Sequence, residues 1–175
     1  MRRSAPPGET AVSRAMAVKP RDHAPHELDA PPWRRVEATL MATARGIRQA
    51  FDRRFEPLGL NLSQASLLAF LHESGPLAQT ALAARLGVGR AAAGCVVDAL
   101  EERGLVERQP DPSDRRVWLV TTTQAGKELA AAVALRDQVL RAELRAGISR
   151  SERQQLAQLL LRLQSNLERV LSNPD

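Results

Sequence analysis

The sequence predicts a mainly α-helical chain with one small β-hairpin, and three observations support this fold class. Apolar residues recur every three or four positions in most segments between residues 33 and 171, which is the period of one helical face. Strand-like segments occur only at 105–108 and 117–121, on either side of a loop rich in Pro and Asp. With 175 residues, of which 43% are hydrophobic, the chain is long enough to bury a core.

Composition and charge restrict the class of protein. The net charge is +5, from 25 basic and 20 acidic residues, and all but two of the basic residues are Arg. Arg suits contacts with phosphates and base edges, but a GC-rich codon bias produces the same composition, so both explanations stay open. Cys95 is the only cysteine, which excludes an intrachain disulfide and favours a reducing compartment. Because no apolar run approaches the length of a membrane span, we expect a soluble, cytoplasmic protein that does not bind membranes.

Residues 1–30 are predicted to form a disordered tail, because prolines and charges of both signs occur there without apolar periodicity. His23 and His26 lie in this tail, but two histidines alone lack the third and fourth ligands of a metal site. We therefore predict neither a bound metal nor a cofactor.

Residues 31–75 are predicted to form two helices. The first begins at a pair of prolines, which suit a first helical turn, and ends at Pro57 and Gly59. Ser63 is expected to cap the second, which stops at Gly75 and Pro76. The apolar stripe of the first helix extends over about six turns and consists of Val36, Leu40, Ala44, Ile47, Phe51 and Phe55.

Residues 123–175 are predicted to form two long helices. Thr123 can cap an Ala-rich helix that continues to about residue 146, and Ser149 with Glu152 forms a capping box for the last helix. The stripe of the last helix is too apolar for a helix that stands alone on a surface. It consists of Leu156, Leu159, Leu160, Leu163, Leu167, Val170 and Leu171.

Residues 76–122 have the pattern of a winged helix-turn-helix. Two short helices, at 79–85 and 90–103, are separated by the tight turn from Gly87 to Gly89, and the hairpin follows at once. In this motif the second helix enters the major groove of DNA and its inner face packs on the domain. The expected inner face consists of Ala93, Val96, Val97 and Leu100. The expected groove-facing residues are Arg90, Ala91, Gly94, Cys95 and Asp98, and the methyl group of Ala92 is counted with them as a thymine contact.

The stretch from Leu77 to Gly126 resembles the winged-helix core of the MarR family of bacterial transcription regulators. Three segments carry the resemblance: 82–88 (LAARLGV), 100–108 (LEERGLVER) and 111–116 (DPSDRR). The order of the flanking helices extends it to about residues 33–172. Thr122 stands where the family pattern has Leu, which we expect to weaken packing at the head of the following helix more than it affects DNA binding.

The resemblance implies a homodimer that presents two recognition helices to a palindromic operator. Residues 31–75 would serve dimerisation and linking, 76–122 DNA binding, and 123–175 dimerisation. The apolar stripes at 36–55 and 156–171 agree, because they need a partner surface. At the tip of the wing, Arg115 and Arg116 carry positive charge, and Arg116 is expected to enter the minor groove. Asp114 is expected to orient Arg116 or the neighbouring backbone.

The resemblance also implies control by a small aromatic or phenolic effector, and we expect a repressor because occupancy of a promoter palindrome blocks polymerase. Such an effector acts only if it binds the DNA-incompetent arrangement more tightly. The residues predicted to form the ligand pocket offer apolar faces and a cation, although each also fits a plain core or surface role. They are Arg48, Phe51, Phe55, Ser66, Phe70 and His72.

Two alternatives to a ligand-responsive repressor remain. An enzyme is not predicted, because only His72 is available outside the tail for a catalytic pair and the 87–89 turn lacks the third glycine of a dinucleotide loop. A protein-interaction module without specific DNA binding is possible, because the recognition helix has few side-chain donors. Cys95 could sense oxidants, but it has no second cysteine and no local cation cluster, which favours an ordinary helix residue.

Overall fold

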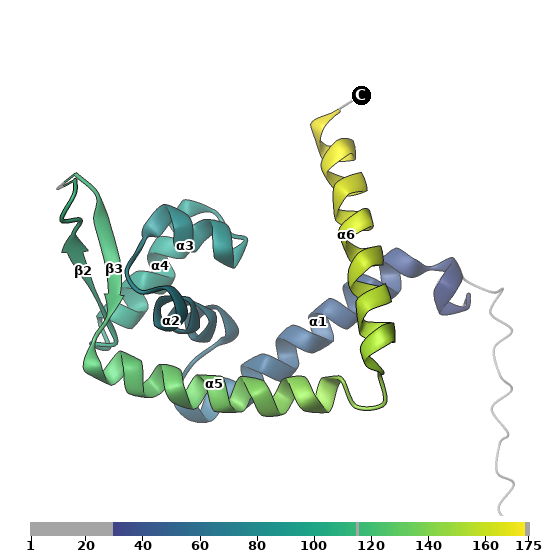
Figure 1. Ribbon diagram of the computed structural model, residues 1–175, viewed down its shortest axis with the longest axis horizontal. Helices are drawn as coiled ribbons and strands as arrows, with labels where there is room; N and C mark the ends of the chain where they lie inside the picture. Colours follow the sequence, from purple (N-terminus) through teal and green to yellow (C-terminus); the bar gives the residue numbers. More distant parts are fainter. Residues whose placement is uncertain (1–29, 115, 174–175) are drawn as a thin grey trace, which may run out of the picture. The chain divides into compact units, whose positions relative to one another are not determined.

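The computed structural model describes residues 30–114 and 116–173 of the chain (Figure 1). Residues 1–29 of the predicted tail, which include its two histidines, and Arg115 lie outside the described residues. The chain divides into two compact units, residues 1–42 and 43–175. The predicted fold class is confirmed, with helices α1 (Val36–Phe55), α2 (Leu62–Ser74), α3 (Gln79–Leu86), α4 (Arg90–Glu101), α5 (Gln124–Leu144) and α6 (Arg150–Ser172), and strands β1 (Leu77–Ala78), β2 (Val106–Pro110) and β3 (Trp118–Thr122).

Two short 3-10 helices flank α1, Pro32–Arg34 before it and Glu56–Leu58 after it. The helix expected from the proline pair therefore starts with a 3-10 turn, and its regular α-helical part begins at Val36. Within the described residues no single helix has the length and hydropathy to cross a membrane; α3 and α4 taken together do, by length and composition, but they meet at a bend of 107°.

The hydrophobic core of residues 43–175 lies among α2, α3, α4, the hairpin and α5. Leu67 and Leu68 of α2 are fully buried, as are Leu82 of α3 and Val97 of α4. Helix α5 packs along α2 and contributes Val133 to the same core. The helix-turn-helix and the hairpin are therefore held by a core that includes residues before them in the sequence, from α2, and after them, from α5.

The cap of α2 differs from the prediction, because Asn61 and not Ser63 begins the helix. The Asn61 side chain accepts a hydrogen bond from the Gln64 backbone N–H at 2.9 Å, and the Gln64 side chain accepts one from the Asn61 N–H at 3.1 Å. Asn61 has the extended backbone of a capping residue, whereas Ser63 already lies in the first turn. Gly75 ends the helix as expected.

The sheet has three strands in the order β1-β3-β2, one more than predicted. In β1, Leu77 pairs with Val120 and Ala78 with Leu119. Two residues are too few to show the alternation that identifies a strand, so β1 could not be predicted from local sequence. The hairpin strands also begin and end later than predicted. Pro110 closes β2, which is possible because β2 is an edge strand where a missing N–H is tolerated.

The junction between the wing and α5 is tightly packed. Thr123 caps α5 as predicted, since its hydroxyl accepts from the Gly126 N–H at 3.1 Å and donates to the Gly104 carbonyl at 2.7 Å. A Cβ built on Gly126 would lie only 1.9 Å from the Leu105 carbonyl oxygen, so no other residue fits there without displacing the backbone. Thr122, where the family pattern has Leu, is half-buried and pairs with Val106.

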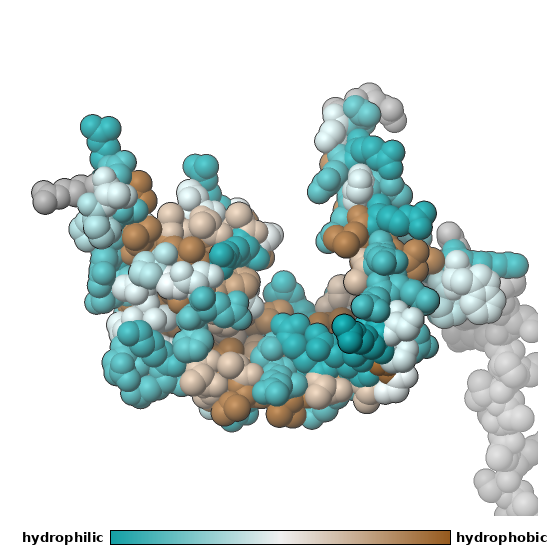
Figure 2. All heavy atoms as spheres, viewed as in Figure 1, coloured by the Kyte–Doolittle hydropathy of each residue, from teal (hydrophilic) through white to brown (hydrophobic). Residues whose placement is uncertain are grey.

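Helix α6 begins at the predicted Ser149–Glu152 capping box, and none of its residues is buried. Figure 2 shows apolar side chains on its surface. Helix α1 similarly exposes Val36, Met41 and Ile47. The prediction that these stripes need a further surface is consistent with this exposure. The large apolar residues that α6 exposes are Leu156, Leu159, Leu161, Leu167, Val170 and Leu171.

Candidate nucleic-acid interface

Helices α3 and α4 form a helix-turn-helix. They meet at 107°, within the range typical of this motif. Gly87 ends α3 in the left-handed conformation, at φ +65°, and its N–H is directed to the carbonyls of Ala83 and Ala84. Gly89 then begins α4 with an extended backbone. The turn is short because a residue in the left-handed region reverses the chain at once, and glycine adopts that region without steric cost.

The two faces of α4 are separated as the sequence predicted. Ala93, Val97 and Leu100 are buried, and Val96 is partly buried against the same core. The predicted DNA-facing residues Arg90, Ala91, Ala92 and Cys95 are exposed, whereas Gly94 is half-covered. The exposed face is thus held outward by the burial of the opposite one.

An ionic contact that the sequence did not reveal connects α4 with the wing. Arg108 of β2 donates to the Asp98 carboxylate at 2.5 Å and also to Glu101, both on α4. The hydrogen bond that Arg108 donates to Asp98 is the main cause of the raised pKa of Arg108. Burial lowers this pKa by a smaller amount, and the negative charges of Glu101 and Asp98 raise it further. The contact fixes β2 on α4 and places a cation beside the one acidic side chain expected to face the groove.

The wing tip is shaped by two aspartates. The Asp111 carboxylate accepts hydrogen bonds from the Ser113 hydroxyl at 2.6 Å and the Ser113 N–H at 2.7 Å, and these lower the pKa of Asp111. The Asp114 carboxylate accepts from the Arg116 backbone N–H at 2.9 Å. Asp114 therefore holds the backbone that carries Arg116, whose side chain is exposed. This arrangement presents a guanidinium on a constrained loop.

The residues predicted to form a ligand pocket are in different environments. Phe51 and Phe55 are buried in the core with ring centroids 5.8 Å apart, and Phe70 is half-buried with the Arg85 guanidinium 5.8 Å from its ring centroid. Ser66 is half-buried, whereas Arg48 and His72 are exposed.

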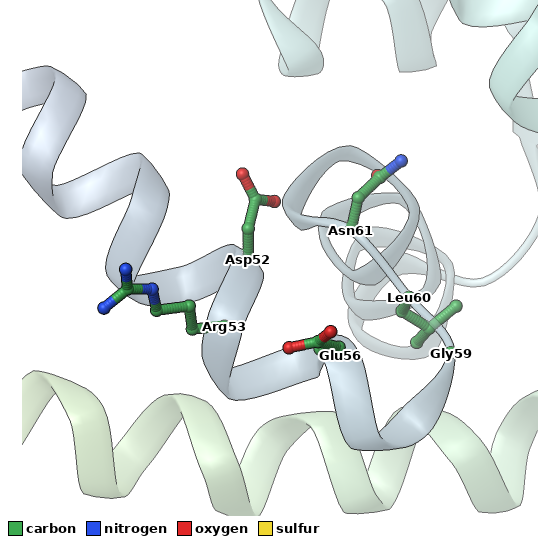
Figure 3. A pocket seen from close by; sticks show the side chains of 6 residues that line it. All are labelled: Asp52, Arg53, Glu56, Gly59, Leu60 and Asn61. Atoms are coloured by element: carbon green, nitrogen blue, oxygen red, sulfur yellow. The ribbon is translucent and has the colours of Figure 1, made fainter.

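A hollow of about 390 Å³ lies at the end of α1, and none of its lining residues belongs to the predicted pocket. Figure 3 shows Asp52 and Asn61 on one side of it and Glu56 on the other. It is lined by Asp52, Arg53, Glu56, Gly59, Leu60 and Asn61. Among the described residues, no group of three or more His, Cys, Asp or Glu side chains is placed to hold a metal ion.

Known proteins match this chain in sequence and in structure. The model of the MarR family matches residues 60–118. The uncharacterized HTH-type transcriptional regulator YdgJ of Bacillus subtilis (strain 168) is 27% identical over 135 residues, which are 77% of this chain and 82% of YdgJ. The crystal structure of the transcriptional regulator PA3341 is 31% identical with a TM-score of 0.70, over 77% of this chain and 98% of PA3341.

The chain is a member of the MarR family. Another similar structure is that of CouR from Rhodococcus jostii RHA1 bound to p-coumaroyl-CoA, which is 29% identical with a TM-score of 0.67 over 71% of this chain and 88% of CouR. The protein is thus a MarR-family winged-helix transcriptional regulator, and the family and its matched relatives are regulators, not enzymes. By its place in the winged helix-turn-helix, α4 corresponds to the helix called the recognition helix in this motif, and β2 with β3 corresponds to the wing.

Proposed function

We propose that this MarR-family regulator binds a palindromic DNA site as a homodimer and represses transcription until a small aromatic or phenolic effector releases it. The observation that carries the proposal is the pairing of two outward-facing elements, the exposed face of α4 and the Arg116 wing tip, joined through Arg108. A major-groove helix and a minor-groove arginine next to each other suit one half-site.

The dimer is supported by the apolar surface that the chain leaves exposed. Helix α6 presents six large apolar residues to solvent and α1 presents three, which is more than an isolated surface helix commonly carries. A second copy supplies the complementary surface by symmetry. In this proposal, residues 31–75 and 123–175 associate with the partner and residues 76–122 bind DNA.

The effector class is supported by CouR, whose structure holds p-coumaroyl-CoA, an aromatic acyl compound. In this chain Phe70 offers a half-buried ring beside the Arg85 cation, and Ser66, His72 and Arg48 offer polar groups at or near the surface. Phe51 and Phe55 are packed together inside the core, so they would serve only as the floor of a cavity.

The experiment is selection of bound fragments from genomic DNA by the wild type, Arg116→Ala and Arg53→Ala, at low and high salt. Arg53 is a matched control: it is an exposed arginine of α1 that lies outside the recognition helix, the wing and the apolar stripe on which the proposed dimer contact rests. We expect the wild type and Arg53→Ala to enrich a palindrome whose half-sites lie about one helical turn apart, and Arg116→Ala to lose it. High salt should weaken all binding, because phosphate contacts release counterions.

If neither the wild type nor the control enriches any sequence at low salt, the proposed DNA binding is wrong. The few hydrogen-bonding groups on the exposed face of α4 then favour the alternative, a protein-interaction module. The effector is tested separately, by titrating p-coumaroyl-CoA and simple phenolic acids into the complex with the selected DNA. Release of DNA by none of them would remove the effector class from the proposal and leave the DNA binding intact.

A further inference from the structure

The exposed face of α4 has few groups of its own that can recognise a base. Ala91, Ala92 and Cys95 contribute small side chains, and Asp98 is already hydrogen-bonded to Arg108. Arg90, at the first position of the helix, is the remaining strong donor on this face. A regulator with one reading arginine per recognition helix distinguishes few sequences, because each base pair is identified by its own pattern of donors and acceptors.

A side chain from another helix lies against α4 at Gly94, beside this exposed face. A Cβ built on Gly94 of α4 would lie 2.9 Å from Nε2 of Gln79, closer than a side-chain carbon can approach. Gln79 is the first residue of α3, so its carboxamide crosses the helix-turn-helix and lies where residue 94 would otherwise place a side chain. Glycine at position 94 is what leaves room for it.

The Gln79 carboxamide is available for a ligand. Gln79 is half-exposed, and its side chain has no hydrogen bond to any residue in the described part of the chain. A primary amide carries two N–H donors and one carbonyl acceptor, so this carboxamide can offer both kinds of group to a ligand that displaces water from it. A side chain that served only to fill space over Gly94 would be better apolar.

We propose that Gln79 is a specificity-determining residue, which contacts a base edge in the major groove through the space that Gly94 leaves open on α4. Gln pairs bidentately with the N6 and N7 atoms of adenine, so the contact is assigned to an A·T pair in each half-site. The inference rests on the proposed DNA binding and adds to it a reading residue that lies outside the recognition helix.

The test is a double-mutant cycle on DNA selected by the wild type. Gln79→Ala removes the carboxamide, and Gly94→Ala displaces it by filling its place. Each should lower affinity about tenfold for the wild-type site and lose preference at the same base pair, without changing the slope of affinity against salt. The double variant should be no weaker than either single variant, because both remove one shared contact.

Gln79→Glu keeps the shape of the side chain and serves as the second variant. Because a carboxylate accepts but does not donate, its preferred partner at that position should move from adenine to cytosine. Circular dichroism of each variant confirms folding.

Three results would overturn the inference. Unchanged base preference in Gln79→Ala means that the residue only fills space. If Gln79→Ala reduces the slope of log affinity against log salt concentration by the amount expected for about one phosphate contact, Gln79 contacts the DNA backbone instead of a base. Additive losses in the double variant mean that Gly94 and Gln79 act separately. If the wild type itself selects no DNA, the proposed function fails first, and that result is distinct from wild-type selection with an unaffected Gln79→Ala.

Discussion

At the residue scale, Gly126 is, among the glycines that the structure describes, the one whose Cβ would meet the closest contact. We expect Gly126→Ala to lower the free energy of unfolding by about 3 kcal/mol, since its Cβ would lie 1.9 Å from the Leu105 carbonyl oxygen. That oxygen also accepts the Thr123 N–H at 3.1 Å, so neither side of the contact can move freely. Urea unfolding followed by circular dichroism measures the change.

Gly46 provides the matched control for this substitution. It lies in α1 with no atom within 4 Å of the position of a Cβ, so Gly46→Ala should raise stability by up to about 1 kcal/mol through helix propensity alone. Equal effects of the two alanines, in size and sign, would show that the Leu105 contact does not limit position 126.

Thr123 contributes through a single hydroxyl with two partners. Thr123→Ala should cost about 1–2 kcal/mol, because it removes both the cap on the Gly126 N–H and the hydrogen bond to the Gly104 carbonyl. Thr123→Ser keeps the hydroxyl and should retain most of this stability. Thermal unfolding of the two variants distinguishes them, and a serine variant as unstable as the alanine variant would assign the effect to the lost methyl group.

At the element scale, the start of α6 should respond to acid. The Ser149 hydroxyl, followed by the Ser149 backbone N–H, lowers the pKa of Glu152 in the folded chain. A carboxyl whose folded pKa lies below its unfolded value of about 4.3 stabilises the fold above that value and loses this contribution as the pH falls through the folded pKa. We therefore expect the first turn of α6 to unwind progressively below about pH 4.

Glu152→Gln isolates this effect, because Gln keeps the shape of the capping box and does not titrate. The pKa of Asp111 is also lowered, so both groups contribute to the acid response of the wild type, and only the difference between the wild type and Glu152→Gln belongs to Glu152. Amide exchange in α6, followed by NMR from pH 6 to pH 2.5, supplies that difference. Identical acid profiles of the two proteins would contradict the prediction.

Local sequence patterns predicted most helices and strands, whereas β1 depends on a contact between residues far apart in the sequence. Thr123 and Ser149 could be recognised as caps because their hydrogen-bonding partners lie three residues away. Asn61 and Gln64 have the same spacing, so this local pattern could also have identified Asn61, and not Ser63, as the cap of α2. Strand β1 exists only because Val120 lies beside Leu77 in the fold.

The candidate interface divides in the same way. Arg116 could be found from its motif, since the wing-tip residues are consecutive in sequence. The Arg108 contact with Asp98 and the position of Gln79 over Gly94 depend on how separate elements pack, so no sequence spacing indicated them.

At the scale of the whole molecule, the exposed leucines of α6 connect the stability of the fold with the association of two copies. If these residues pack on a second copy, the melting temperature rises with protein concentration, because association stabilises only the folded state. Leu159→Asp with Leu167→Asp places two carboxylates on residues that are both more than half exposed in the single chain. This variant should sediment at about 19.1 kDa and melt at a temperature independent of concentration, whereas the wild type should sediment at about twice that mass.

Gln158→Asp with Gln164→Asp adds the same charges at polar positions of α6 and should behave as the wild type. A wild type that sediments as a monomer, or a leucine variant that stays dimeric, would remove α6 from the proposed interface, since two buried carboxylates are too costly for an apolar contact to tolerate.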